Sequence, residues 1–136
     1  MTDSGVVGAE VGIVARDGER LARFYVDGLG FVVESVYEFP QGTVRKLRRG
    51  PARCKLFQPA EGVAERPRVD PWHSLPGAAY AALLVADADA EVANARGAGA
   101  EILVEPTSHR PGARYSLLRD PEGNVWEILE EDIPPA

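Results

Sequence analysis

The sequence lacks several features that define large classes of proteins. It has one cysteine, Cys54, among 136 residues, so no disulfide can form within the chain, and a reducing cytoplasm is the expected location. No apolar run approaches the roughly 18–20 residues that a membrane-spanning helix needs. The first ten residues contain neither a basic segment nor a long apolar one, so no signal peptide is expected. These absences exclude a membrane partner and favour a cytoplasmic protein.

Positive charge and histidine are also scarce. The chain has 15 lysine and arginine residues against 21 aspartate and glutamate residues, and the net charge of −6 argues against nucleic acid as a partner. The only histidines are His73 and His109, and neither falls on a predicted strand, so we expect both on solvated loops. Apolar residues make up 45% of the chain, which is ordinary for a single globular domain spanning 1–136.

Two halves of the chain resemble each other at a shift of 70 residues. This shift places Asp17 on Asp87 near the start of a helical pattern in each half, and it places Arg49 on Arg119 much further along. Two distant blocks that agree on one shift indicate a tandem duplication. Each half is predicted to contain a strand, a helix and three further strands.

The predicted organisation is a first module at 8–59, a proline-rich linker at 60–78 and a second module at 79–131. In the first module a helix begins after Asp17, a favourable N-cap, and ends near Gly30, where glycine accepts the left-handed backbone of a C-cap. The second helix is predicted at 88–97. The predicted strands are 10–16, 31–39, 42–49, 53–59, 79–86, 100–105, 114–119 and 124–130.

Alternation of side chains along a strand divides each strand into two faces. The fully apolar set, which includes Cys54 and Trp126, is expected to pack under the helices. The opposite set contains Glu10, Gly12, Lys55, Phe57, Tyr80 and Glu127. The shift makes Glu10 equivalent to Tyr80, and Lys55 is equivalent to Glu127 if the second module has a turn that is two residues longer. We therefore predict that these four side chains face one shared cavity. Arg45 and Arg114 are expected near its mouth.

Two segments together resemble a known family. They are VGIVARDGERLARFYVDGLGF at 11–31 and LLRDPEGNVWEIL at 117–129, and they resemble the vicinal oxygen chelate superfamily, the glyoxalase/bleomycin resistance/dioxygenase group. The resemblance implies an α+β fold in which two tandem βαβββ modules form a curled mixed-sheet cup, usually in a homodimer. It also implies a divalent metal at the base of the cup, held from the starts of the first and fifth strands and the ends of the fourth and eighth.

At those four positions this chain has Glu10, Tyr80, Lys55 and Glu127, and only Glu127 is of the expected type. Members of the family usually supply histidine from the first and fifth strands. The Lys55 ammonium has no lone pair to offer, and a phenol such as that of Tyr80 must lose a proton with a pKa of about 10. We therefore expect no metal and no other cofactor, with an ion-paired cluster in place of the metal. If Fe, Zn, Ni or Mn binds, Glu10 and Glu127 are its expected ligands.

The function favoured by these residues is binding of a small, mainly apolar molecule in the sheet cup of a homodimer. The predicted ligand-binding residues are Glu10, Gly12, Lys55, Phe57, Tyr80, Arg114 and Glu127. One alternative is a lyase, isomerase, epimerase or dioxygenase of the same superfamily that uses a divalent metal with atypical ligands. Another is metal-free acid/base catalysis, with Glu10, Tyr80 and Glu127 as the catalytic residues. An inert cluster that only keeps the cup open is equally compatible with the sequence.

Overall fold

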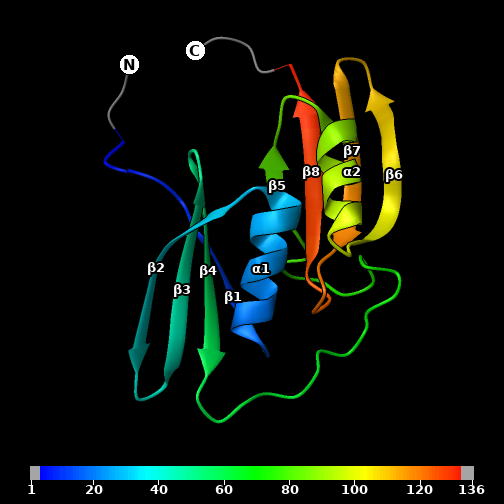
Figure 1. The fold of residues 1–136 in the computed structure, drawn as a ribbon. Coiled ribbons are helices and arrows are strands. Elements are labelled where there is room, and N and C mark those ends of the chain that lie inside the picture. The colour runs from blue at the N-terminus through cyan, green and yellow to red at the C-terminus, as the bar shows by residue number, and fades with distance from the viewer. Residues whose placement is uncertain (1–3, 133–136) are drawn as a thin grey trace.

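A computed structural model describes residues 4–132 of the chain and contains two βαβββ modules (Figure 1). The first module comprises β1 (Val11–Val14), α1 (Gly18–Leu29), β2 (Val32–Phe39), β3 (Gly42–Arg49) and β4 (Ala52–Pro59). The second comprises β5 (Ala81–Leu84), α2 (Ala88–Gly97), β6 (Glu101–Arg110), β7 (Ala113–Arg119) and β8 (Val125–Glu131). The predicted α+β fold with tandem modules is confirmed.

Each module forms its own four-stranded mixed sheet, with strand orders β1-β4-β3-β2 and β5-β8-β7-β6. The first and last strands of each module pair in parallel, and the other neighbours are antiparallel. Gly12 pairs with Lys55, and its repeat partner Ala82 pairs with Glu127. This register makes Lys55 and Glu127 equivalent, as predicted. The connection between β7 and β8, at 120–124, is however three residues longer than that between β3 and β4, at 50–51, and not two as predicted.

The two helices begin in the same way because the duplicated sequence supplies the same cap. The Asp17 carboxylate accepts a hydrogen bond from the backbone N–H of Arg20 at 3.1 Å, and Asp87 accepts one from that of Ala90 at 3.1 Å. Such a cap satisfies one of the backbone donors left free in a first helical turn. Helix α1 ends at Gly30, whose φ of 73° is the left-handed conformation that favours glycine.

The two helices pack against each other and share one hydrophobic core with both sheets (Figure 1). Tyr25 of α1 is fully buried at the centre of this core, and its ring meets that of Trp126 edge-on at 5.6 Å. Cys54 and Trp126 belong to this core, as predicted. Within residues 4–132, no helix packs against the side of either sheet that faces away from its own helix.

One boundary differs from the prediction in a way that matters for the site. Strand β6 continues to Arg110 through several register irregularities, so His109 lies on a strand and not on a loop. The linker contains no helix or strand and runs from the end of β4 around to β5 (Figure 1). Within residues 4–132, neither helix is long and apolar enough to cross a membrane.

Candidate functional site

We call the side of each sheet that lies opposite its helix the open face of that module. On β1, Ile13 packs toward the core while Val14 points the other way and is 59% exposed. The same alternation on β4 sends Leu56 into the core, so Lys55 and Phe57 lie on the open face. In the first module, each of these side chains therefore lies on the face of its strand that the alternation of side chains predicted.

An ion-paired cluster lies on the open face of the first module. One carboxylate oxygen of Glu10 is 3.3 Å from the Lys55 ammonium, and the other is 3.5 Å from that of Lys46. Lys46 and Lys55 are side by side because they pair directly across β3 and β4. Sequence reasoning missed Lys46. The short Gly50-Pro51 connection between the two strands was the signal that could have fixed their register and identified it.

Aromatic and aliphatic side chains surround this cluster. Phe39 and Phe57 stack with ring centroids 5.8 Å apart and an interplanar angle of 11°. Tyr37 lies on the same face of β2 and is 47% exposed, and Val14 is more exposed still. The open face of the first module therefore combines a charged centre with apolar side chains that are exposed in the described part of the chain.

Glu127 lies on the open face of the second module, opposite Leu117 on β7. Partial burial raises the pKa of the Glu127 carboxyl, His109 lowers it and Glu131 raises it further. The His109 ring meets the Tyr115 ring edge-on at 4.7 Å. Within residues 4–132, Glu127 makes no ion pair, which makes it the carboxyl of the open faces best suited to holding a proton.

The titration of Glu127 gives a test of this environment. Because the folded-state pKa lies above its ordinary value of 4.5, the contribution of Glu127 to stability is present below pH 4.5 and is lost as the pH rises through the folded pKa. We expect Glu127→Gln to gain stability relative to the wild type as the pH rises through this window. We also expect His109→Gln to raise the Glu127 pKa, as measured by carboxyl-carbon NMR. A titration midpoint at or below 4.5 would contradict this account.

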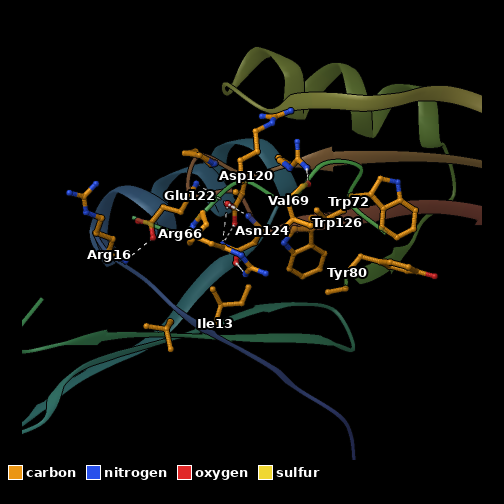
Figure 2. A pocket seen from close by; sticks show the side chains of 18 of the residues that line it. Ile13, Arg16, Arg66, Val69, Trp72, Tyr80, Asp120, Glu122, Asn124 and Trp126 are labelled. Carbon is orange, nitrogen blue, oxygen red and sulfur yellow. Dashed lines mark hydrogen bonds between the residues drawn. The ribbon is translucent and has the colours of Figure 1, made fainter. Parts of the chain in front are cut away.

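The four residues predicted to share a cavity do not form one cluster within a single chain. Glu10 and Lys55 are ion-paired, but no ion pair within residues 4–132 joins Glu127 or Tyr80 to either of them. Tyr80 instead meets Trp72 of the linker edge-on at 5.6 Å (Figure 2). The physical reason is that Glu10 and Lys55 belong to one sheet and Glu127 to the other, and no hydrogen-bonded strand pair joins the two sheets.

The prediction that Arg114 lies near the mouth of the cup is wrong. Its guanidinium donates to the Asp89 carboxylate of α2 at 2.9 Å, so its side chain lies on the helix-bearing side of β7. Arg45 likewise lies against Gly18 at the start of α1. Both side chains lie on the same face of their strands as core residues. The alternation of side chains along each strand in the sequence already predicted this face.

The DPEGN motif holds the two modules together. Buried Asp120 accepts hydrogen bonds from the Tyr25 hydroxyl at 2.7 Å and from the backbone N–H groups of Glu122 at 2.9 Å and Asn124 at 3.0 Å. The Tyr25 hydroxyl in turn accepts a hydrogen bond from Trp126 Nε1 at 2.9 Å. Burial raises the pKa of the Asp120 carboxyl and these hydrogen bonds oppose that shift. This motif therefore has a structural role.

The residues at the metal positions of the family do not fit a divalent ion in this chain. Glu10 is already neutralised by two ammonium groups, and Lys55 occupies a ligand position with a positive charge. Residues 4–132 contain no group of three or more histidine, cysteine, aspartate or glutamate side chains arranged to hold a metal.

Comparison with known proteins identifies the family. The profile of the Glyoxalase/Bleomycin resistance protein/Dioxygenase superfamily matches residues 9–128, so the chain belongs to this superfamily. No curated protein matches the sequence.

Solved structures with low sequence identity share the fold. A glyoxalase family protein from Bacillus cereus is 19% identical with a TM-score of 0.78, over 96% of this chain and 98% of that one. A glyoxylase/bleomycin resistance protein/dioxygenase domain from Frankia sp. EAN1pec is 17% identical with a TM-score of 0.75, over 98% and 96%. Glyoxalase I from Zea mays is 16% identical with a TM-score of 0.72, over 93% of this chain but only 45% of that one. This chain thus spans less than half the length of the maize enzyme.

Proposed function

We propose that this superfamily member binds a small, mainly apolar molecule at its open faces without a divalent metal. The observation that carries the proposal is the Glu10 cluster, in which Lys46 and Lys55 supply the positive charge that a metal ion would otherwise bring. The stacked Phe39 and Phe57 rings beside it offer an apolar surface for the ligand. A cytoplasmic location, expected from the single cysteine, is part of the same proposal.

We propose a second copy of this chain as the partner that completes the cup. Val32, Tyr37 and Phe39 are at least 40% exposed on the first open face, and Leu84 is 55% exposed on the second. The first face carries Lys46 and other cations, whereas Glu127 makes the second one acidic, so the two faces complement each other in charge. Sedimentation of the wild type at twice the chain mass supports this homodimer, and a monomer at all concentrations contradicts it.

Metal analysis and ligand binding test the proposed function together. We expect substoichiometric Fe, Zn, Ni and Mn in the purified protein and no change in melting temperature on adding EDTA, because no metal binding energy would be lost. In a thermal-shift screen of aromatic natural products and keto acids, we expect hits whose stabilisation falls in Phe57→Ala and Lys55→Met.

The matched control for the ligand screen is Arg114→Gln, which removes a cation from the other side of its sheet and should leave those shifts unchanged. Stoichiometric metal that is lost to EDTA together with stability would contradict the proposal.

A second candidate function is metal-free proton abstraction by Glu127. The observation that favours it is the raised pKa of this carboxyl, which has no ion-pair partner within residues 4–132. A base of this kind would exchange hydrogen next to a ketone carbonyl, which NMR follows as loss of signal in deuterium oxide. Glu127→Gln should then slow exchange by about 100-fold. Equal exchange rates in the two proteins would eliminate this candidate.

A further inference from the structure

Four cations form a compact block on the open face of the first module. Lys46 pairs directly with Lys55 across β3 and β4, and Arg48 pairs directly with Arg53 one row nearer the turn between these strands. All four side chains lie on the open face, because the residue between the two cations of each strand is buried in the core. Like charges directly opposite each other on a sheet are destabilising. This arrangement therefore favours negative charge close to it.

The chain supplies only part of that negative charge. Glu10 lies 3.5 and 3.3 Å from the two lysine ammonium groups. The Glu34 carboxylate accepts a hydrogen bond from Arg48 at 3.2 Å, which lowers the pKa of Glu34, and the charge of Arg53 lowers that pKa further. Glu38, the other carboxylate of β2, lies on the opposite face by alternation. Among the described residues of this face, four cations therefore stand against two carboxylates, which leaves two positive charges unbalanced.

Space for an anion adjoins the block. The Arg53 guanidinium forms neither an ion pair nor a hydrogen bond with any residue of 4–132, and Arg53 lines a pocket of about 300 Å³ together with Glu10 and Ala82. Gly12 pairs with Lys55 and leaves further room beside it. Apart from its chain neighbours, no described atom lies within 4 Å of the point where a side chain at Gly12 would begin. A ligand can therefore approach the block from solvent.

An apolar row lies next to the lysine row on the same face. Val44 pairs with Phe57 two residues along the strands from the Lys46–Lys55 pair, a separation of roughly 7 Å. Phe39 extends this row by stacking on Phe57. An aromatic ring placed on Phe57 is therefore one row away from an ammonium group, a gap that a short aliphatic link can span.

We propose that the ligand of this face is an aromatic carboxylate in which a short aliphatic link separates the ring from the charge. The inference rests on the proposed function, because it names the chemical class of the ligand for the same surface. The carboxylate would accept a charge-assisted hydrogen bond from Lys55 within the field of Arg53, and the ring would pack on Phe57. In the proposed homodimer, the facing surface adds one unpaired carboxylate, Glu127, so a positive charge still remains for the ligand.

Calorimetric titration of the full chain with 3-phenylpropionate tests the inference, with neutral 3-phenylpropanamide as the matched ligand. At low ionic strength we expect saturable binding of the carboxylate, at least tenfold weaker binding of the amide, and loss of this difference as salt is added. Lys55→Met should weaken carboxylate binding about tenfold, because a charge-assisted hydrogen bond is lost. Arg53→Gln should weaken it severalfold through the lost field, and both variants should change amide binding little.

Two further variants locate the site. Gly12→Leu removes no charge but fills the space beside Lys55, so it should weaken binding of both ligands. The matched control is Arg20→Gln, which removes the same charge as Arg53→Gln from an exposed position on α1 and should bind the carboxylate as the wild type does. Circular dichroism and melting temperature establish that each variant is folded.

Three results would overturn the inference: no saturable carboxylate binding at millimolar concentration, equal affinity for the carboxylate and the amide, or weakening by Arg20→Gln as large as that by Arg53→Gln. Equal affinities that both fall in Phe57→Ala would refute the anionic class alone and leave the proposed function standing. The proposed function fails separately, through the metal analysis and the thermal-shift screen, because hits in that screen need not carry a charge.

Discussion

Replacing Asp120 with alanine is expected to lower the free energy of unfolding by about 3–4 kcal/mol, as measured by urea denaturation. The substitution removes the acceptor for the Tyr25 hydroxyl and for the two backbone N–H groups of the turn. Asp120 is only 4% exposed, so water cannot readily replace it. Removing a buried, hydrogen-bonded carboxylate leaves its donors unpaired. The loss of unfolding free energy is therefore larger than the net contribution of any one of its hydrogen bonds.

Two further variants separate this network from a general effect of losing an aspartate. Asp120→Asn keeps the shape and one acceptor oxygen and should lose clearly less stability than the alanine variant. Asp27→Ala, on the exposed side of α1, should stay within about 0.5 kcal/mol of the wild type. An alanine variant at position 120 that unfolds at the wild-type urea concentration would show that the motif does not tether the modules.

The second large effect is expected at another contact between the modules. Arg49 donates to both carboxylate oxygens of Glu91 in α2, at 2.8 and 2.5 Å, and to the backbone carbonyl of Leu29 at 3.1 Å. The pair is partly exposed, and after allowing for solvent screening we expect Arg49→Met to cost about 1–2 kcal/mol of unfolding free energy. Urea denaturation monitored by circular dichroism measures this change.

Arg114→Met is the matched control for Arg49→Met. Arg114 also makes a two-pronged ion pair, with Asp89, but the pair is more exposed and lies within the second module. The Arg114→Met variant should therefore show no measurable loss of unfolding free energy. Equal losses in the two variants would indicate that linking the modules adds nothing to the value of the Arg49 pair.

The repeat made most of the fold predictable. The shift of 70 residues that aligned Asp17 with Asp87 also relates the observed helix starts at Gly18 and Ala88. Cap residues, glycine ends and strand alternation act over a few neighbouring positions, so the sequence itself contains them. The end of β6 was not predicted, because an irregular strand with Pro106 in it carries little of the alternating pattern.

The sequence predicted on which face of its strand most candidate site residues lie, but not which of these residues contact one another. Parity placed Glu10 and Lys55 on one side of their strands, and the structure shows them 3.3 Å apart. Lys46 was missed because its closeness to Lys55 depends on the register between β3 and β4. Arg114 was misplaced because it was assigned to the cup mouth from its position on a strand related by the repeat to that of Arg45, without regard to the face of the strand on which its side chain lies.

The sequence by itself determined two duplicated modules, their helix caps and the face on which each strand side chain lies, because these follow from local periodicity. Only the tertiary structure decided which of those faces meet. The angle between the sheets and the partners of Glu10 depend on packing between residues far apart in the chain. Such packing is set by the shared core around Tyr25 and Trp126, which no short stretch of sequence specifies.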